Sequence, residues 1–370
     1  MAKQPDPYLA TDEVYSRLKS TGKQVTEWGQ AIDGTPMLGV KTGGDKQPAI
    51  FITAGAHCTE TAGVHSALNL LELLDTDHEV HVLPLRDPLG FGGVDRCLSF
   101  AAGQSVSVPD ADACLAYLKA HADLLWHTDE AYLFKLGDLG FMWDIARPGL
   151  DTFWRQFNLM AHLNDNEPDV IQPLRGHSVM LVNVNSDIEG SGAMQRCYHT
   201  IVDNNGQWLH LNRYLGQEEA PPEVAAVNRV MQTVKPGLTC DLHEGNGTGF
   251  WMPLTKPEEN PGRVVEMTRA YFDYIRSRGY PITTYDEWRE TDQTNASDSD
   301  WLLAAPELEG LFWLNALLKN EGHNLITYSH LFGIAYGTEA PMVQPLAMRT
   351  DGITNGIHAA IKIWERTVPG

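Results

Sequence analysis

The stretch PAIFITAGAHCTETAG, residues 48–63, decides the fold of this chain. Residues 48–54 are apolar and β-branched, which predicts a buried strand, and residues 62–74 have the apolar spacing of an amphipathic helix. His57 and Glu60 therefore lie on a strand-to-helix connection. Side chains three residues apart in a first helical turn project on the same side, so this pair could grip one ion.

A second segment downstream, CDLHEGNG at residues 240–247, repeats this pattern. Leu238 to Asp241 is a short strand-like run, and His243 follows it. Both candidate ligand groups then lie at the carboxyl ends of strands, where open α/β sheets place their sites. Two imidazoles and one carboxylate leave the fourth position of a zinc ion open, as in catalytic sites. The sequence therefore predicts one Zn²⁺ per chain, held by His57, Glu60 and His243.

Four segments together resemble the zinc metallocarboxypeptidase superfamily, which includes carboxypeptidases, succinylglutamate desuccinylases and aspartoacylases. They are WGQAIDGTPM from Trp28, GAHCTE from Gly55, DLH from Asp241 and YGTEAP from Tyr336. The matches come in the order of that family and span roughly residues 25 to 345. The resemblance implies the same zinc ligands, and it implies that Glu339 is the catalytic glutamate.

Physical chemistry gives Glu339 the same role. Zinc lowers the pKa of water, but a carboxylate is still needed to take the proton and pass it to the leaving amine. Glu339 is the candidate base and acid, and Glu244 is its competitor because it follows the third ligand. Asp241 either orients a ligand from outside the coordination sphere or caps the following turn.

Substrate recognition departs from the pattern of the family. Arg96 matches by distance the arginine that stabilises the oxyanion. Where carboxypeptidases carry an Asn-Arg pair for the terminal carboxylate, this chain has Asn185 followed by Ser186, and serine cannot form a bidentate clamp. Tyr328 is the counterpart of a substrate-facing tyrosine. Either the substrate is not an ordinary peptide C-terminus, or another arginine replaces the missing one, the candidates being Arg175, Arg196 and Arg213.

Composition restricts the partners. The 370 residues include 48 acidic and 27 basic ones, giving a net charge of −21, so nucleic acid and anionic membranes are poor partners. Five scattered cysteines form no Cys-x-x-Cys pair, which favours a reducing compartment. The N-terminus shows no signal-peptide pattern, and no apolar run reaches membrane length, so we expect a cytoplasmic protein.

Strand and helix patterns alternate along the chain. This alternation predicts a single α/β domain with a mixed, mostly parallel central sheet flanked by helices on both faces. The segment 97–177 is longer than the family needs between its arginine and asparagine segments. Its length predicts a helical insertion near the active-site mouth, which is either a lid or extra scaffold. Residues 308–319 are expected as a helix and residues 324–328 as a strand.

These observations predict a zinc hydrolase that cleaves an amide bond with metal-activated water. The substrate is expected to be a small peptide or an N-acyl amino acid, so carboxypeptidase and deacylase activities stay open beside esterase or lactonase activity. A catalytically inactive metal-binding module is the alternative from a different class. It would not need Glu339. The sequence leaves the acyl group and the oligomeric state open.

Overall fold

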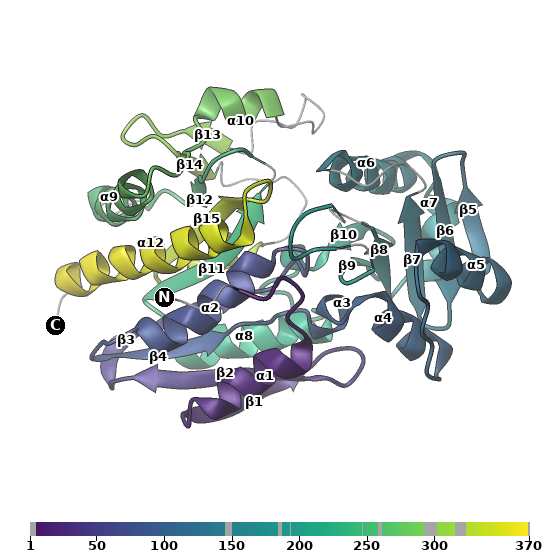
Figure 1. Cartoon of the computed structure of the whole chain (residues 1–370), viewed down its shortest axis with the longest axis horizontal. Coiled ribbons are helices and arrows are strands. Elements are labelled where there is room, and N and C mark those ends of the chain that lie inside the picture. The colour runs from purple at the N-terminus through teal and green to yellow at the C-terminus, as the bar shows by residue number, and fades with distance from the viewer. Residues whose placement is uncertain are drawn as a thin grey trace.

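The computed structural model describes residues 5–144, 150–183, 187–192, 194–245, 247–257, 261–291, 302–314 and 323–368. Asn185 and Ser186 lie outside the described residues. Within this part of the chain, helices pack on three sheets (Figure 1).

The first sheet has six strands and carries the two candidate ligand segments. In spatial order its strands are β1 (Gln24–Gln30), β2 (Pro36–Gly43), β4 (His78–Leu83), β3 (Lys46–Ala54), β11 (Leu238–Gly245) and β15 (Ile334–Pro341). The strands β4, β3, β11 and β15 run parallel, whereas β1 and β2 are joined antiparallel. The predicted mixed sheet is therefore present.

The second and third sheets lie beside the first (Figure 1). The second contains, in spatial order, β10 (Trp208–His210), β9 (Cys197–Val202), β8 (His177–Val182), β7 (Leu139–Asp144), β6 (Ala131–Leu136) and β5 (Asp123–His127). The third contains β12 (Met252–Leu254), β14 (Leu311–Leu314) and β13 (Leu302–Ala304). In the second sheet only β7 and β8 run parallel among the described strands. A mostly parallel architecture is therefore not confirmed.

Helices cover both faces of the first sheet, as predicted. One face is covered by α1 (Thr11–Ser20), α2 (Thr61–Leu73), α9 (Pro261–Ser277) and α12 (Leu346–Thr367); the other is covered by α8 (Pro222–Val234), α11 (Leu325–Ser329) and the 3₁₀ turn η2 (Leu211–Arg213). The second sheet has beside it α3 (Pro88–Phe91), α4 (Gly93–Ala102), α5 (Ala111–His121), α6 (Leu150–Asn166), α7 (Pro168–Ile171) and η1 (Gln172–Leu174). The helix α10 (Tyr285–Thr291) packs on the third sheet.

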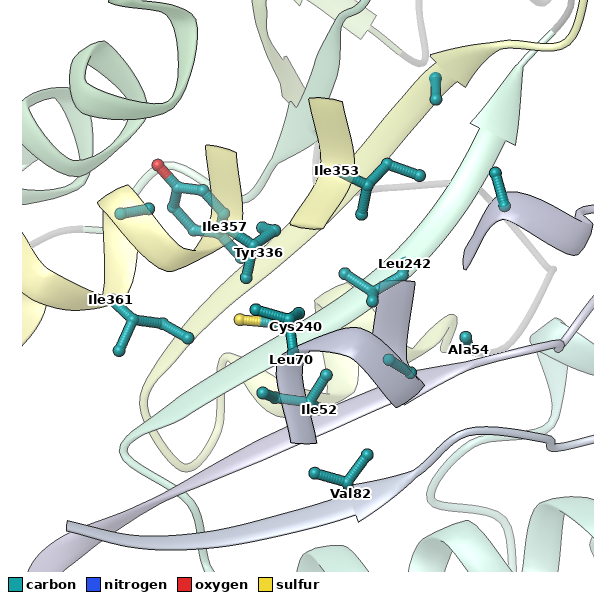
Figure 2. Packing of buried hydrophobic residues seen from close by; sticks show 14 of the residues in the cluster. Ile52, Ala54, Leu70, Val82, Cys240, Leu242, Tyr336, Ile353, Ile357 and Ile361 are labelled. Atoms are coloured by element: carbon teal, nitrogen blue, oxygen red, sulfur yellow. The ribbon is translucent and has the colours of Figure 1, made fainter. Parts of the chain in front are cut away.

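The alternation of side chains along β3 explains the two-sided core. Ile50 and Ile52 belong to the cluster under α2 and α12, whereas Phe51 between them packs on the opposite face with α8. Figure 2 shows Ile52 together with Ile353 and Ile357 of α12 in the first of these clusters. A strand buried on both faces is continuously apolar, which is why residues 48–54 predict it well.

Three sequence expectations need correction. Residues 97–177 are not purely helical, because they contain β5, β6 and β7. Residues 311–314 form strand β14, and residues 325–329 form the short helix α11. Short apolar runs fit a helix or a strand equally well, and in these places tertiary pairing decided.

Two further observations concern the cysteines and the helices. All five cysteines are buried and free. Among the residues described, no helix has both the length and the apolar character needed to cross a bilayer.

The histidine of α2 that packs near the N-terminal segment makes stability depend on pH. Burial lowers the pKa of His65 from 6.5 to about 4, and its Nε2 lies 2.8 Å from the carbonyl oxygen of Asp6. The folded state thus disfavours the protonated ring, so the His65 contribution is complete above pH 6.5 and is lost as the pH falls towards 4.

We therefore expect the free energy of unfolding to fall between pH 7 and about 4.5 by roughly 2–3 kcal/mol more in the wild-type protein than in His65→Gln. Urea unfolding of both proteins at the two pH values measures this difference. Parallel losses in the two proteins would show that His65 is not protonated on unfolding.

Candidate metal centre

His57, Glu60 and His243 meet at the carboxyl edge of the first sheet because two neighbouring parallel strands end there. His57 and Glu60 follow β3, and His243 lies on β11, which pairs with β3 from Leu238 to Leu242. Gly63 brings α2 close to β11, since a Cβ at this position would lie 2.5 Å from the carbonyl oxygen of Leu242. The sheet register thus joins ligands from distant parts of the sequence.

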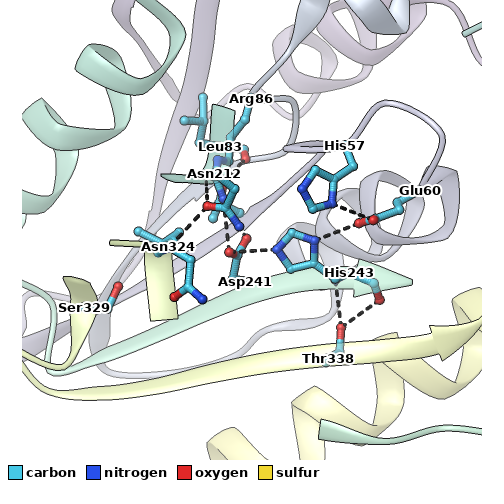
Figure 3. A network of polar contacts seen from close by, with 12 residues as sticks. His57, Glu60, Leu83, Arg86, Asn212, Asp241, His243, Asn324, Ser329 and Thr338 are labelled. Carbon is cyan, nitrogen blue, oxygen red and sulfur yellow. Dashed lines mark hydrogen bonds and ion pairs between the residues drawn. The ribbon is translucent and has the colours of Figure 1, made fainter. Parts of the chain in front are cut away.

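The two imidazoles face the same carboxylate (Figure 3). Nδ1 of His57 lies 2.6 Å from Oε1 of Glu60, and Nδ1 of His243 lies 2.7 Å from Oε2. One donor atom from each of the three side chains lies within 4.8 Å of the others. They are the only such group of three or more His, Cys, Asp or Glu side chains in the described part of the chain.

The second nitrogen of His243 is held by a buried polar network. Nε2 of His243 lies 2.8 Å from Oδ2 of Asp241, and Arg86 donates to both oxygens of Asp241 at 2.9 and 3.1 Å. Arg86 also donates to Oδ1 of Asn212, as Figure 3 shows. A carboxylate on the remote nitrogen fixes the imidazole tautomer with the Nδ1 lone pair available for a metal. The alternative in which Asp241 orients a ligand is therefore favoured over a turn cap.

The ring of His57 packs against the second sheet. It stacks on Tyr198 of β9, with centroids 5.0 Å apart, and its Nε2 lies 3.4 Å from Nδ1 of His210 on β10. Phe157 of α6 contacts the rings of Tyr198 and His210 edge-on. The segment 97–177 thus reaches the wall of the site through α6, although its role as a lid stays a prediction.

The pKa values of Glu60, His57 and the neighbouring His210 reflect burial and nearby charges. Burial opposes ionisation of Glu60, but His57 and His243 outweigh it and lower the pKa of Glu60 to about 2. Burial lowers the pKa of His57. Burial also lowers that of His210 well below its usual value, reinforced by Arg213. His210 is thus neutral at pH 7, and its Nδ1 can accept from His57.

Glu339 lies on the neighbouring strand β15, where it is the register partner of His243. Partners in adjacent parallel strands project on the same face of a sheet. The carboxylate of Glu339 lies beside Gly245. A Cβ added to Gly245 would lie 3.1 Å from Oε2 of Glu339 and 3.1 Å from Nε1 of Trp251. Burial raises the pKa of Glu339 well above its usual value. His243 opposes this rise, whereas the negative charges of Glu60 and Asp241 add to it. The side chain is partly exposed, so solvent reaches it.

Glu244, the competitor of Glu339, occupies a different environment. Its side chain is fully buried and forms an ion pair with Arg349, and its Oε2 accepts from the main-chain nitrogen of Ala62 at 2.6 Å. These partners occupy its carboxylate and favour Glu339 as the base.

In the described part of the chain, the side chains of Arg96, Arg196 and Tyr328 contact residues other than the three ligands. Arg96 pairs with Asp33 at 2.7 Å. Arg196 is buried and donates to the carbonyl oxygens of Phe91 and Leu9. These contacts account for both arginines within the chain, and their roles in catalysis and substrate binding stay predictions.

Tyr328 likewise has the surroundings of a core residue. It packs in the cluster with α8, and its ring lies against Gly216, where a Cβ would meet it at 2.7 Å. Its neighbour Phe332 contacts the ring edge-on. This packing argues against the expected substrate-facing position.

Two arginines act electrostatically on residues of the site: Arg86, which no motif singled out, and Arg213, one of the three candidates for the carboxylate clamp. Arg86 is buried on Asp241, and its charge lowers the pKa of His57 and His210. The position of Arg86 just after β4, at the same sheet edge as the ligands, was a signal in the sequence. Arg213 is half-buried in η2, and its charge adds to the lowering of the pKa of His210 by burial. Burial raises the pKa of Tyr198 well above its usual value, and the charge of Arg213 opposes that rise.

Comparisons with known proteins agree with this fold. No protein-family model matches the chain, and no curated protein matches it in sequence. Among solved structures, a candidate metallopeptidase from Shewanella denitrificans OS217 superposes with a TM-score of 0.50 at 11% identity, covering 97% of this chain and 94% of the other. A candidate metallopeptidase from Shewanella amazonensis SB2B gives 0.46 at 16% identity, with 96% and 93% covered. The carboxypeptidase A of Helicoverpa armigera gives 0.45 at 12% identity, with 96% and 72% covered.

The shared fold rests on the Shewanella denitrificans structure, because the other two scores are lower. The chain therefore shares the fold of this candidate metallopeptidase, which agrees with the resemblance that the sequence motifs indicate.

The donor set fits a divalent transition metal, because two Nδ1 atoms and a carboxylate converge while the remote nitrogens are held by Asp241 and His210. We expect His57→Ala and His243→Ala each to lose most of the bound metal that the wild-type protein carries. Elemental analysis after dialysis against a weak chelator measures the stoichiometry. Full metal content in both variants would place the site elsewhere, and His162→Ala, an exposed substitution, serves as control.

Proposed function

We propose that this chain is a zinc-dependent hydrolase that cleaves an amide bond, as metallocarboxypeptidases do. The observation that carries the proposal is the convergence of His57 and His243 on Glu60, with Glu339 beside His243 on the neighbouring strand. Three protein ligands are the number found in catalytic zinc sites, which keep one position for water or substrate.

In this proposal His57, Glu60 and His243 hold one zinc ion. When bound, zinc supplies Lewis acidity that activates water and polarises a carbonyl group. The chain fixes the ligands: Asp241 orients His243, and Nδ1 of His210 lies 3.4 Å from the outer nitrogen of His57. Tyr198 and Trp251 lie beside His57 and Glu339, respectively, and exclude bulk water from these sides.

Glu339 is the proton carrier in this proposal. Its carboxylate takes a proton from the attacking water and delivers it to the nitrogen of the leaving amine. Partial exposure lets substrate reach the group, and desolvation together with the neighbouring carboxylates of Glu60 and Asp241 favours the protonated form between the two transfers. A carboxylate with two strong fixed partners, as Glu244 has, is unsuited to this task.

Arg213 is the candidate that best replaces the arginine found in carboxypeptidases where this chain has Ser186. It ends the 3₁₀ turn η2 directly after β10, and its charge acts on His210 and Tyr198, which line the side of His57. All three candidates donate to main-chain carbonyl oxygens, Arg213 to that of Asn212, Arg175 to that of Asn204 and Arg196 to that of Phe91. What distinguishes Arg213 is the effect of its charge on His210 and Tyr198. We therefore infer that Arg213 attracts an anionic group of the substrate, such as a free carboxylate.

A short peptide and an N-acyl amino acid both carry a free carboxylate. They differ in the group on the acyl side of the scissile amide bond. The choice between carboxypeptidase and deacylase therefore belongs to experiment. Esterase activity would use the same groups. An inactive metal-binding module would keep the three ligands without Glu339, and the presence of this carboxylate in register with His243 favours the enzyme.

Conversion of Glu339 to Gln should leave metal content unchanged and lower kcat by about 10²- to 10⁴-fold, because the amide keeps the shape but cannot take a proton. A panel of dipeptides and N-acyl amino acids, assayed with zinc-loaded protein, supplies the substrate for this measurement. Glu309→Gln, at an exposed site, is the control. Turnover within a few-fold of the wild type in Glu339→Gln would remove this residue from the mechanism.

The role of Arg213 is tested with one substrate in two forms, as a free acid and as its carboxamide. We expect wild-type kcat/KM to favour the free acid by about 10- to 100-fold, the worth of a hydrogen bond to a charged group. In Arg213→Met this preference should shrink to a few-fold, whereas Arg175→Met should keep it. Equal rates for the two substrates with the wild-type protein would reject a carboxylate clamp.

A further inference from the structure

The first turn of α2 lacks the cap that its own N-terminal residue would normally supply. Glu60 stands at the N-cap position, yet its side chain makes no capping hydrogen bond. Its two oxygens face His57 and His243 instead. The first amide groups of a helix have no partners within the helix, so another acceptor must serve them.

Glu244 supplies that acceptor from β11. Its Oε2 accepts from the main-chain nitrogen of Ala62, the second residue of α2, at 2.6 Å. Glu244 directly follows the ligand His243 in the sequence. One carboxylate therefore ties the helix that begins after Glu60 to the strand that carries His243, and its charge is also favourable at a helix N-terminus.

Arg349 of α12 holds this carboxylate in place. Its Nη1 donates to Oε1 of Glu244, and both side chains are completely inaccessible to solvent. Its Nη2 donates to the carbonyl oxygen of Glu189 at 2.5 Å. A buried anion needs a partner, so Glu244 depends on Arg349 to stay in its place beside α2.

The same arginine also anchors the segment 187–192, which follows the predicted substrate-binding Asn185. The side chain of Glu189 accepts from the main-chain nitrogen of Leu346 at the start of α12, at 2.7 Å. The hydroxyl of Thr61, the first residue of α2, donates to the carbonyl oxygen of Gly190 at 2.6 Å. The segment thus contacts both α12 and α2 through hydrogen bonds.

We propose that Arg349 is a positioning residue of the metal centre, which acts through Glu244 to set Glu60 against His243 and which anchors the segment 187–192 to the same point. It touches neither substrate nor metal. The inference rests on the proposed function, because it assumes that Glu60 and His243 share one ion. Without Arg349, Glu244 is an unpaired buried anion next to the ligand Glu60, and α2 loses the acceptor for its first turn.

The experiment measures zinc affinity, by competition with a chromophoric chelator, for the wild-type protein and three full-length variants. Arg349→Met removes the guanidinium, and Arg349→Lys keeps the charge on a group that cannot reach Glu244 and the carbonyl of Glu189 in the same fork. Arg263→Met is the matched control, because Arg263 contacts α12 at Thr367, at the other end of the helix. Thermal unfolding followed by circular dichroism reports on the fold of each variant.

We expect zinc binding about 10- to 100-fold weaker in Arg349→Met, the range typical of partners behind metal ligands, an intermediate loss in Arg349→Lys, and a change below about two-fold in Arg263→Met. If Arg349→Met does not fold, Arg349→Lys decides. Wild-type zinc affinity in a folded Arg349 variant, even one with a lower Tm, would overturn the positioning role and leave the proposed metal centre intact. A wild-type protein that binds no zinc would overturn both.

Discussion

The approach of the two Nδ1 atoms of His57 and His243 to the carboxylate of Glu60 is the interaction on which the rest of the site depends. It exists because β3 and β11 are parallel neighbours whose carboxyl ends meet at one edge. A buried carboxylate between two imidazoles is costly unless the groups are paired, and a divalent cation is the partner that satisfies all three. The sheet register therefore determines the chemistry available here.

Around these ligands, polar groups from distant elements fix each side chain in turn. Asp241 and Arg86 hold His243 from the sheet, and Glu244 together with Arg349 holds the start of α2. Every one of these groups is buried, so each depends on its partner for the compensation of its charge. This interdependence explains why the site needs a large scaffold: the partners come from the sheet, from α2 and from the C-terminal helix α12.

The sequence predicted the ligand-bearing strands well because their signals are local. Residues 48–54 and 238–241 are short apolar runs followed by glycine-containing turns, and the His and Glu side chains stand at their ends. The helix predicted at residues 62–74 forms at Thr61–Leu73. The second sheet was missed because residues 123–144 were interpreted as part of a helical insertion. Their strands are specified by pairing with one another and, through β7, with β8 rather than by a local motif.

The residues around the ligands were harder to predict, because their function depends on contacts across the sequence. Tyr328 was expected near the substrate from its position before Glu339, and Arg196 was one candidate for the missing clamp arginine. They pack against Gly216 and Phe91, respectively. Arg349 carried no motif, and only the fold brings it to Glu244. Buried cations of this kind become visible once the elements that they join are placed.

The most direct measurement of the central claim is anomalous diffraction at the zinc edge from crystals of the zinc-loaded protein. The account predicts one strong peak, bonded to Nδ1 of His57, Nδ1 of His243 and the carboxylate of Glu60, at ligand distances of about 2.0–2.2 Å. A peak at any other place in the molecule, or one bonded through Nε2 of either histidine, would contradict it.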